Sequence, residues 1–183
     1  MFEVLHFRGS DKILKKKNML NDVQATMQYI DDVLTGALYK RELLRMALDE
    51  MDWGVDSDAM RIIEGRRYMY KGVKRGVAVE GNIAAYEYIL EGLVRLQIGY
   101  DKQRIDAGIL LVNAKRSEKS PLGPVTDLIK SEIEALYPTI NLPVTICMID
   151  PGDPIIFDEE GIVNGSVSVP QDENRETEKS SKG

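Results

Sequence analysis

The sequence places a carboxylate at the end of an apolar segment, where an ionised side chain is costly. Residues 71–82 read KGVKRGVAVEGN, and the apolar run VAV leads directly into Glu80. A charge at the end of a buried strand must meet a metal ion, a cation or a hydrogen-bond network. Lys71, Lys74 and Arg75 stand just before it, so this stretch is the first candidate for chemistry.

An acid at a strand end is one half of the arrangement that cleaves phosphodiesters. Two acids hold Mg²⁺, which polarises the phosphate and lowers the pKa of the attacking water. A nearby lysine or amide then orients that water or stabilises the developing charge. The segment Glu80-Gly81-Asn82 fits an acid followed two residues later by an amide. The pattern is common by itself, and its weight comes from its position after the strand.

Basic side chains are concentrated around the same stretch. Residues 61–76 hold six of them against a single acid, Glu64, and residues 8–17 hold five more against one acid. The net charge of -6 belongs to the acidic segment 150–160 and to the tail, because residues 1–149 are neutral overall. Local basic density is what phosphate binding needs, although a solvated hairpin face is the alternative. The candidates for DNA contacts are Arg66, Arg67, Lys74 and Arg75.

Periodicity predicts an α/β fold with a mixed central sheet flanked by helices. Residues 21–34 carry an apolar stripe at three- and four-residue steps, which is typical of a helix. Nearly continuous apolar runs at 104–112 and 141–150 indicate buried strands. Strands and helices alternate over 77–149, so we expect parallel pairing with crossover connections there. The other predicted elements are strands 2–7, 61–70 and 73–80, with a tight turn at Gly72, and helices 37–51, 84–99 and 125–137.

Composition and length narrow the class of protein. The 183 residues suffice for one main domain, predicted at 1–151, with a short extension at 152–170 and a disordered polar tail at 171–183. The single cysteine, Cys147, lies in the run PVTICMI and is expected to be a core thiol. Without a signal peptide, a disulfide partner or a long apolar run, the sequence favours a cytoplasmic protein with no membrane segment.

In order and spacing, the chain resembles the BglII/BstYI family of type II restriction endonucleases, a branch of the PD-(D/E)xK nuclease fold. The likeness covers about residues 1–151. FEVLHF and the helix after it resemble the family's opening, KGVKRGVAVEGN its catalytic strand, and RIDAGILLV and LPVTICMIDP its later core. The resemblance implies a restriction-endonuclease-like core, Mg²⁺ as cofactor and double-stranded DNA as substrate.

The departures from the family pattern concern its chemistry. Lys71 stands nine residues before Glu80, where the family has a metal-binding aspartate, and a lysine cannot ligate Mg²⁺. We expect its ammonium to form an ion pair with Glu80. Asn82 stands for the family's glutamine. A second metal-binding acid must then come from elsewhere, with Glu64 the first candidate and Glu87 and Glu91 on the following helix the others.

Two functions remain open from the sequence. The first is a Mg²⁺-dependent endonuclease with a rearranged site in a restriction or phage-defence system, in which Glu80, Asn82 and Lys71 form the catalytic set and Glu80 with Glu64 holds the metal. The second is a catalytically silent protein of the same fold that binds DNA or assembles with a partner through its acidic C-terminal extension. The family also implies a homodimer, for which the helices of 21–51 are the candidate surface.

Overall fold

Three apolar segments of the sequence become the central strands of one sheet, β3 (Val77–Asn82), β4 (Ala107–Asn113) and β5 (Val144–Ile149). β4 pairs in parallel with both neighbours, which confirms the predicted adjacency and the crossover connections. Shorter strands run antiparallel at the two edges, β1 (Phe2–Phe7) on β5 and β2 (Gly72–Lys74) on β3. The order β1-β5-β4-β3-β2 is the predicted mixed sheet.

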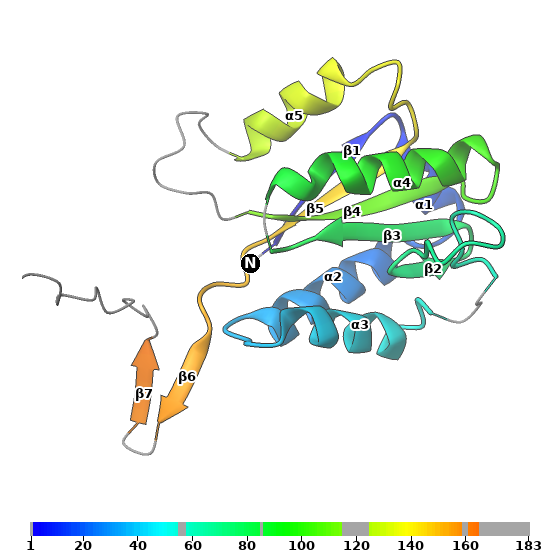
Figure 1. Ribbon diagram of the computed structural model, residues 1–183. Helices are drawn as coiled ribbons and strands as arrows, with labels where there is room; N and C mark the ends of the chain where they lie inside the picture. The colour runs from blue at the N-terminus through cyan, green and yellow to red at the C-terminus, as the bar shows by residue number, and fades with distance from the viewer. Residues whose placement is uncertain (1, 55–57, 85, 115–124, 159–160, 165–183) are drawn as a thin grey trace, which may run out of the picture.

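Helices cover both faces of this sheet, so the fold has three layers (Figure 1). The computed structural model describes residues 2–54, 58–84, 86–114, 125–158 and 161–164, with the backbone alone at Glu87, at 157–158 and at 161–164. One face carries α1 (Ser10–Lys16), α2 (Leu20–Leu34) and α3 (Lys40–Glu50), and the other carries the 3₁₀ turn η1 (Tyr86–Tyr88), α4 (Ile89–Asp101) and α5 (Val125–Ala135). In the described residues no helix is long and apolar enough to cross a membrane.

Each central strand sends alternate side chains into two separate cores. In β3, Val77 and Val79 pack in the core under α1, α2 and α3, whereas Ala78 packs in the core under α4 and α5. Successive side chains of a strand point to opposite faces, so the two faces of β3 are fixed by this alternation. Cys147 is completely buried, as expected for a core thiol.

Residues 61–70 do not form the predicted strand. The segment folds back on itself, with one isolated bridge between Arg61 and Met69 and a backbone hydrogen bond from the Ile62 N–H to the Tyr68 carbonyl. Its centre is the charged run EGRR, which offers no alternating apolar face to a sheet, and Gly65 has a φ of 69°. We call residues 58–71 the basic loop.

Three further boundaries differ from the sequence-based expectation. The hairpin turns at Arg75 and Gly76, which both have positive φ, and Gly72 lies inside β2. The helix expected from residue 84 begins as a 3₁₀ turn and becomes α-helical only at Ile89. The short helix α1 was not predicted, because its seven residues provide few apolar repeats.

After β5 the chain leaves the sheet and forms a small antiparallel hairpin, β6 (Ile155–Asp158) and β7 (Gly161–Asn164). The start of this extension is tied to the loop between α2 and α3. Gly36 donates to the Pro151 carbonyl at 2.8 Å and accepts from the Ile155 N–H at 2.9 Å. The domain boundary near residue 151 stays a prediction, and the tail at 171–183 lies outside the described residues.

Candidate functional site around Glu80

Glu80 lies within the central sheet and is almost completely buried, with 2% of its surface exposed. It pairs with Leu110 of the parallel strand β4. Because Ala78 faces α4 and α5, Glu80 two residues later faces the same side. The Glu80 carboxylate, which the sequence singled out, is therefore inside the protein, between β3 and α4.

Arg95 of α4 meets this carboxylate. Its Nη1 lies 3.2 Å from Oε1 and 3.4 Å from Oε2 of Glu80, and the Gly81 N–H donates to Oε2 at 3.3 Å. The same guanidinium places Nε 3.7 Å from the exposed carboxylate of Glu91. One arginine thus bridges a buried and an exposed acid.

Two glycines allow α4 to come close enough to β3 for this contact. A Cβ on Gly92 would lie 2.3 Å from Cδ1 of Leu110, and Gly92 faces the backbone of Gly81. Arg95 follows Gly92 by three residues, so it projects from the same face of the helix. Gly81 itself has a φ of 122°, and a Cβ there would lie 2.1 Å from the Leu111 carbonyl oxygen. Gly81 therefore cannot carry a side chain, because its Cβ would meet backbone atoms, whereas a Cβ on Gly92 would require the end of the Leu110 side chain to move.

Opposing influences act on the pKa of Glu80. Burial removes the carboxylate from water and raises its pKa above the ordinary value of 4.5, and this is the largest influence. The charges of Arg95 and then Lys71, together with the Gly81 N–H, act in the opposite direction. The net pKa is raised, so the ionised form depends on its cationic neighbours.

Lys71 contributes charge to the site but does not make the predicted ion pair. Its backbone N–H donates to the Val79 carbonyl at 2.9 Å, so it lies directly before β2 and beside β3. Among the described residues, the cation within ion-pair distance of Glu80 is Arg95. The sequence predicts a cation beside Glu80, and Arg95 is that cation. The prediction that Lys71 makes the ion pair was wrong. The pairing depends on how α4 crosses β3, which residues 71–82 do not encode.

The other predicted site residues have partners of their own, and no described contact joins their side chains to Glu80. Asn82 is exposed, and its Oδ1 accepts the Ala84 N–H at 2.9 Å, so its carbonyl oxygen already serves the turn after β3. The Glu64 carboxylate is 91% exposed and lies 3.8 Å from Arg104. Glu91 reaches Arg95 alone among the cations described. The side chain of Glu87 lies outside the described residues.

The four basic candidates also separate. Arg66 and Arg67 are exposed on the basic loop. Lys74 is bound within the protein, 3.0 Å from an Asp22 oxygen and 3.0 Å from the Met51 carbonyl. Arg75 is exposed at the turn between β2 and β3.

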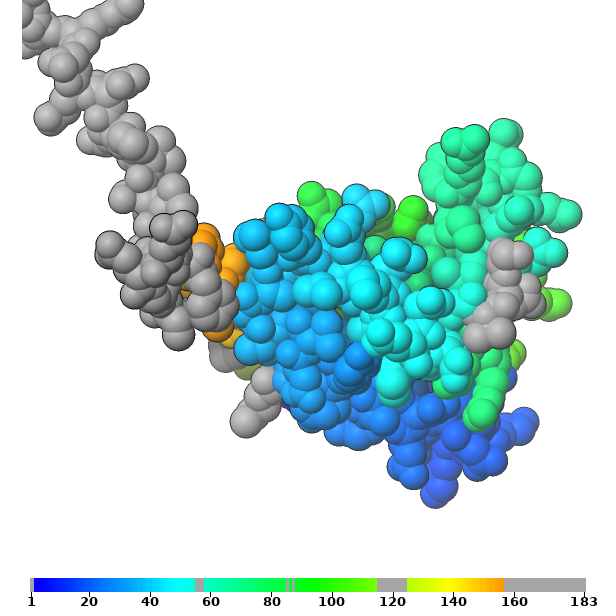
Figure 2. Space-filling view, turned by 90° about the horizontal axis from the view of Figure 1, so that it is seen from below, coloured from blue at the N-terminus to red at the C-terminus, as the bar shows by residue number. Residues whose placement is uncertain are grey.

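A cleft of 610 Å³ opens beside Glu80, at the β2 edge of the sheet. The basic loop forms one side of it, and in Figure 2 this loop stands out from the body beside α3. α3 from one layer and α4 from the other form the remaining sides. We call this hollow the basic cleft because five basic side chains and a single acid, Glu42, line it: Arg41, Arg45, Arg67, Lys71 and Arg95.

Comparison with known proteins identifies the architecture. No family model matches the sequence, and no curated protein matches it. The solved structure of the restriction endonuclease BglII complexed with a DNA 16-mer superposes with a TM-score of 0.56 and 12% identity, over 82% of this chain and 76% of that one. Free BglII superposes with a TM-score of 0.53 and 12% identity, over 81% and 79%. This chain has a restriction-endonuclease-like fold.

The restriction-endonuclease-like fold raises the question of a divalent metal ion, and the residues around Glu80 do not fit one. Mg²⁺ requires several oxygen ligands that converge on one point. The described residues contain no group of three or more His, Cys, Asp or Glu side chains that could hold a metal ion. The charged groups that act on the Glu80 carboxylate are Arg95 and Lys71, and both would repel a metal cation.

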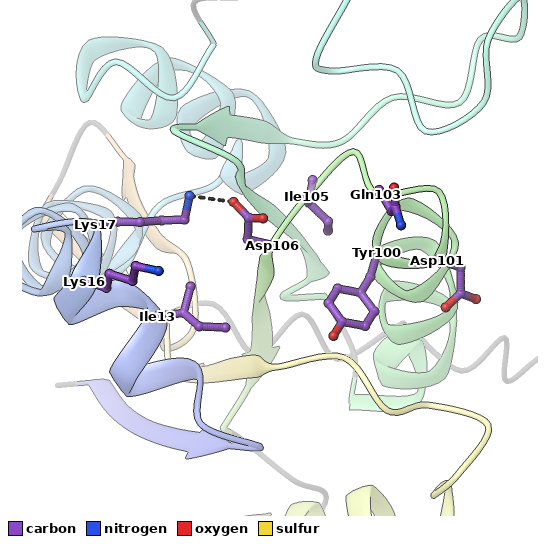
Figure 3. Close-up of a pocket in the computed structure, with 8 residues that line it drawn as sticks. All are labelled: Ile13, Lys16, Lys17, Tyr100, Asp101, Gln103, Ile105 and Asp106. Atoms are coloured by element: carbon purple, nitrogen blue, oxygen red, sulfur yellow. Dashed lines mark ion pairs between the residues drawn. The ribbon is translucent and has the colours of Figure 1, made fainter.

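A second hollow of similar size, 650 Å³, lies between α1 and the end of α4 (Figure 3). Lys16 and Lys17 line one side, while Asp101 and Asp106 are among the residues on the other sides. Lys17 reaches Asp106 at 2.5 Å and donates to the Arg75 carbonyl at 2.8 Å. The charges of this hollow are balanced, so it does not attract an anion as the basic cleft does. We call it the balanced hollow.

Proposed function

We propose that this chain binds double-stranded DNA through the basic cleft and does not cleave it with Mg²⁺. The observation that carries the proposal is the contact between Arg95 and Glu80 at 3.2 Å. The guanidinium neutralises the one buried acid of the site, and Lys71 adds a second positive charge. The cleft beside it is strongly basic, as phosphate binding requires.

The likeness to BglII in complex with DNA supports duplex DNA as the partner. The basic loop and α3 bring exposed arginines to one cleft from distant parts of the sequence, and this concentration of positive charge supports contact with a phosphate backbone. A homodimer belongs to the same proposal, since twofold symmetry suits a palindromic duplex. Leu38, Tyr39 and Met46, near and on α3, are 57%, 68% and 48% exposed and support a surface there.

A Mg²⁺-dependent endonuclease is the second candidate, and Glu91 favours it. Glu80 and Glu91 contact the same guanidinium, so the two carboxylates lie on either side of Arg95. If Arg95 turned toward a DNA phosphate, both acids would lose their cation together. A role in restriction or phage defence belongs to this endonuclease candidate, and a partner that docks on the acidic extension belongs to the protein that does not cleave DNA.

The test is a fluorescence-anisotropy titration of a labelled duplex at several salt concentrations. We expect the double variant Arg41→Gln/Arg67→Gln to bind more weakly and to flatten the dependence of log K on log salt by about 0.9 for each phosphate that is no longer neutralised. The matched control is Lys12→Gln/Lys15→Gln on α1, which removes the same charge from exposed positions away from the cleft.

Equal effects of the two double variants would reject the basic cleft as the DNA site. The cleavage arm incubates the wild-type protein with the duplex and Mg²⁺ or Mn²⁺. We expect no cleavage. Cleavage that disappears in Glu80→Gln would establish the endonuclease and overturn the proposal that the protein does not cleave DNA.

A further inference from the structure

The basic cleft combines a cationic rim with an apolar side, and a site for a phosphate alone does not need the apolar side. Its rim is cationic, but Leu44 and Leu48 of α3 and Met60 and Met69 of the basic loop also line it. Its 610 Å³ falls in the range of pockets that enclose a whole small ligand. A phosphate alone would use the rim and leave the apolar side empty.

Arg95 offers one uncommitted donor group to this cleft. Its Nη1 contacts Glu80 and its Nε faces Glu91, while Nη2 has no hydrogen-bond or ion-pair partner among the described residues. The side chain is 29% exposed and lines the cleft. A guanidinium held in place by two carboxylates is preorganised to bind a phosphate oxygen through its remaining edge.

Tyr70 adds an aromatic ring that carries no negative charge. Its hydroxyl lies against Gly99 of α4, where a Cβ would come within 1.6 Å, so the glycine is needed for the ring to fit. Burial raises the pKa of Tyr70 to about 12, with the charge of Glu80 acting in the same direction. The phenol therefore stays neutral near physiological pH and does not oppose an anionic ligand.

We propose that the basic cleft takes one unpaired nucleotide, with its base against the apolar side and its phosphate on Arg95 and the rim arginines. The inference rests on the proposed function where the nucleotide belongs to a bound DNA strand. A free nucleotide has the same chemistry and is the other source. Extruding a base from a duplex costs a few kcal/mol of stacking and pairing, which contacts in such a pocket offset.

The experiment uses a duplex with 2-aminopurine in place of one base at each position in turn, because its fluorescence rises when it leaves the stack. We expect a severalfold rise at one position when the protein binds, and we expect dAMP to compete for this signal. Anisotropy of the same samples reports duplex binding separately.

The test variant is Met69→Glu, which places an acid on the apolar side of the cleft at a position that is 44% exposed. The matched control is Leu90→Glu, which adds the same charge to α4 at a residue that is 47% exposed and does not line the cleft. We expect dAMP to bind about tenfold more weakly to Met69→Glu and within about twofold of wild type to Leu90→Glu.

The outcomes separate the two proposals. Duplex binding without any 2-aminopurine signal or dAMP competition overturns the nucleotide pocket and leaves the proposed function standing. Binding of dAMP that is weakened by Met69→Glu, without duplex binding, supports the pocket for a free nucleotide and rejects the proposed function. Equal effects of Met69→Glu and Leu90→Glu on dAMP binding overturn the pocket.

Discussion

Glu80 and Asp106 each sit beside a basic side chain near a hollow of similar volume, yet their surroundings differ. The Glu80 side chain is 3% exposed and pairs with Arg95, whereas the Asp106 side chain is 61% exposed and pairs with Lys17. In the first pair, Arg95 offsets part of the free-energy cost of removing the Glu80 carboxylate from water. In the second pair, water already solvates both charges. Proximity of opposite charges thus does not show how much the fold depends on them.

The two hollows differ in the same way. The basic cleft has five basic residues and one acid, while the balanced hollow has two of each. Volume alone ranks the balanced hollow slightly larger, at 650 Å³ against 610 Å³. The sign of the lining charge, rather than the size of the space, favours the basic cleft as a site for an anion.

The largest expected effect comes from removing the cation at the buried pair. Arg95→Met should lower the free energy of unfolding by about 3 kcal/mol, because it leaves Glu80 with less compensation inside the sheet. Urea denaturation at neutral pH measures the change. Glu80→Gln in the Arg95→Met background should recover most of the loss, and a double variant no more stable than Arg95→Met would contradict this account.

The pH dependence of the same variant gives a second readout. An acid whose pKa is raised on folding contributes stability that is present below its ordinary pKa of 4.5 and lost as the pH rises through the folded value. Removing Arg95 raises the pKa of Glu80 further. The deficit of Arg95→Met should therefore be small in acid and grow toward neutral pH, and a deficit independent of pH would point to impaired packing instead.

The next largest effect is expected on the affinity for Mg²⁺ or Mn²⁺. Lys71→Asp alone leaves Arg95 against Glu80, so it should improve Mg²⁺ binding little. The double variant Lys71→Asp/Arg95→Gln supplies a second carboxylate and removes both cations. We expect it to bind Mg²⁺ or Mn²⁺ at least about tenfold more tightly than either single variant by calorimetry. Equal affinity in all forms would show that residue 71 cannot reach a metal at Glu80.

The smallest effect is expected at the exposed pair. Lys17→Met should change the free energy of unfolding by less than about 1 kcal/mol, because exposed ion pairs contribute little. High salt should reduce the change further. A loss as large as that of Arg95→Met in the same urea titration would remove the distinction between the two pairs.

More of the fold than of the candidate site could be predicted from the sequence. Nearly continuous apolar runs identified β4 and β5, because strands buried on both faces have little polar alternation. The same reasoning singled out Glu80, whose burial the structure confirms. The segment 61–70 was assigned wrongly because β-branched and aromatic residues at its ends outweighed the turn-forming EGRR run at its centre.

The partners of Glu80 could not be predicted, because they depend on how elements cross. Arg95 meets Glu80 where α4 packs closely on β3, with Gly92 facing the backbone of Gly81. Arg41 and Arg45 join the basic loop from α3, outside the cluster that the sequence made visible. A search for a cation on the helix after the strand would have found Arg95, as the Glu91–Arg95 spacing of four residues marks that face of the helix.

The route of the chain through the sheet also bears on the order in which the protein assembles. Glu80, Arg95 and Leu110 belong to one strand–helix–strand unit of neighbouring segments, so their contacts close short loops. β1, by contrast, reaches its place only by pairing Phe2 with Ile149 across almost the whole described chain. Contacts of such long sequence separation form slowly. The buried ion pair therefore belongs to the part of the molecule that can organise early, and the amino-terminal strand closes the sheet around a centre already formed.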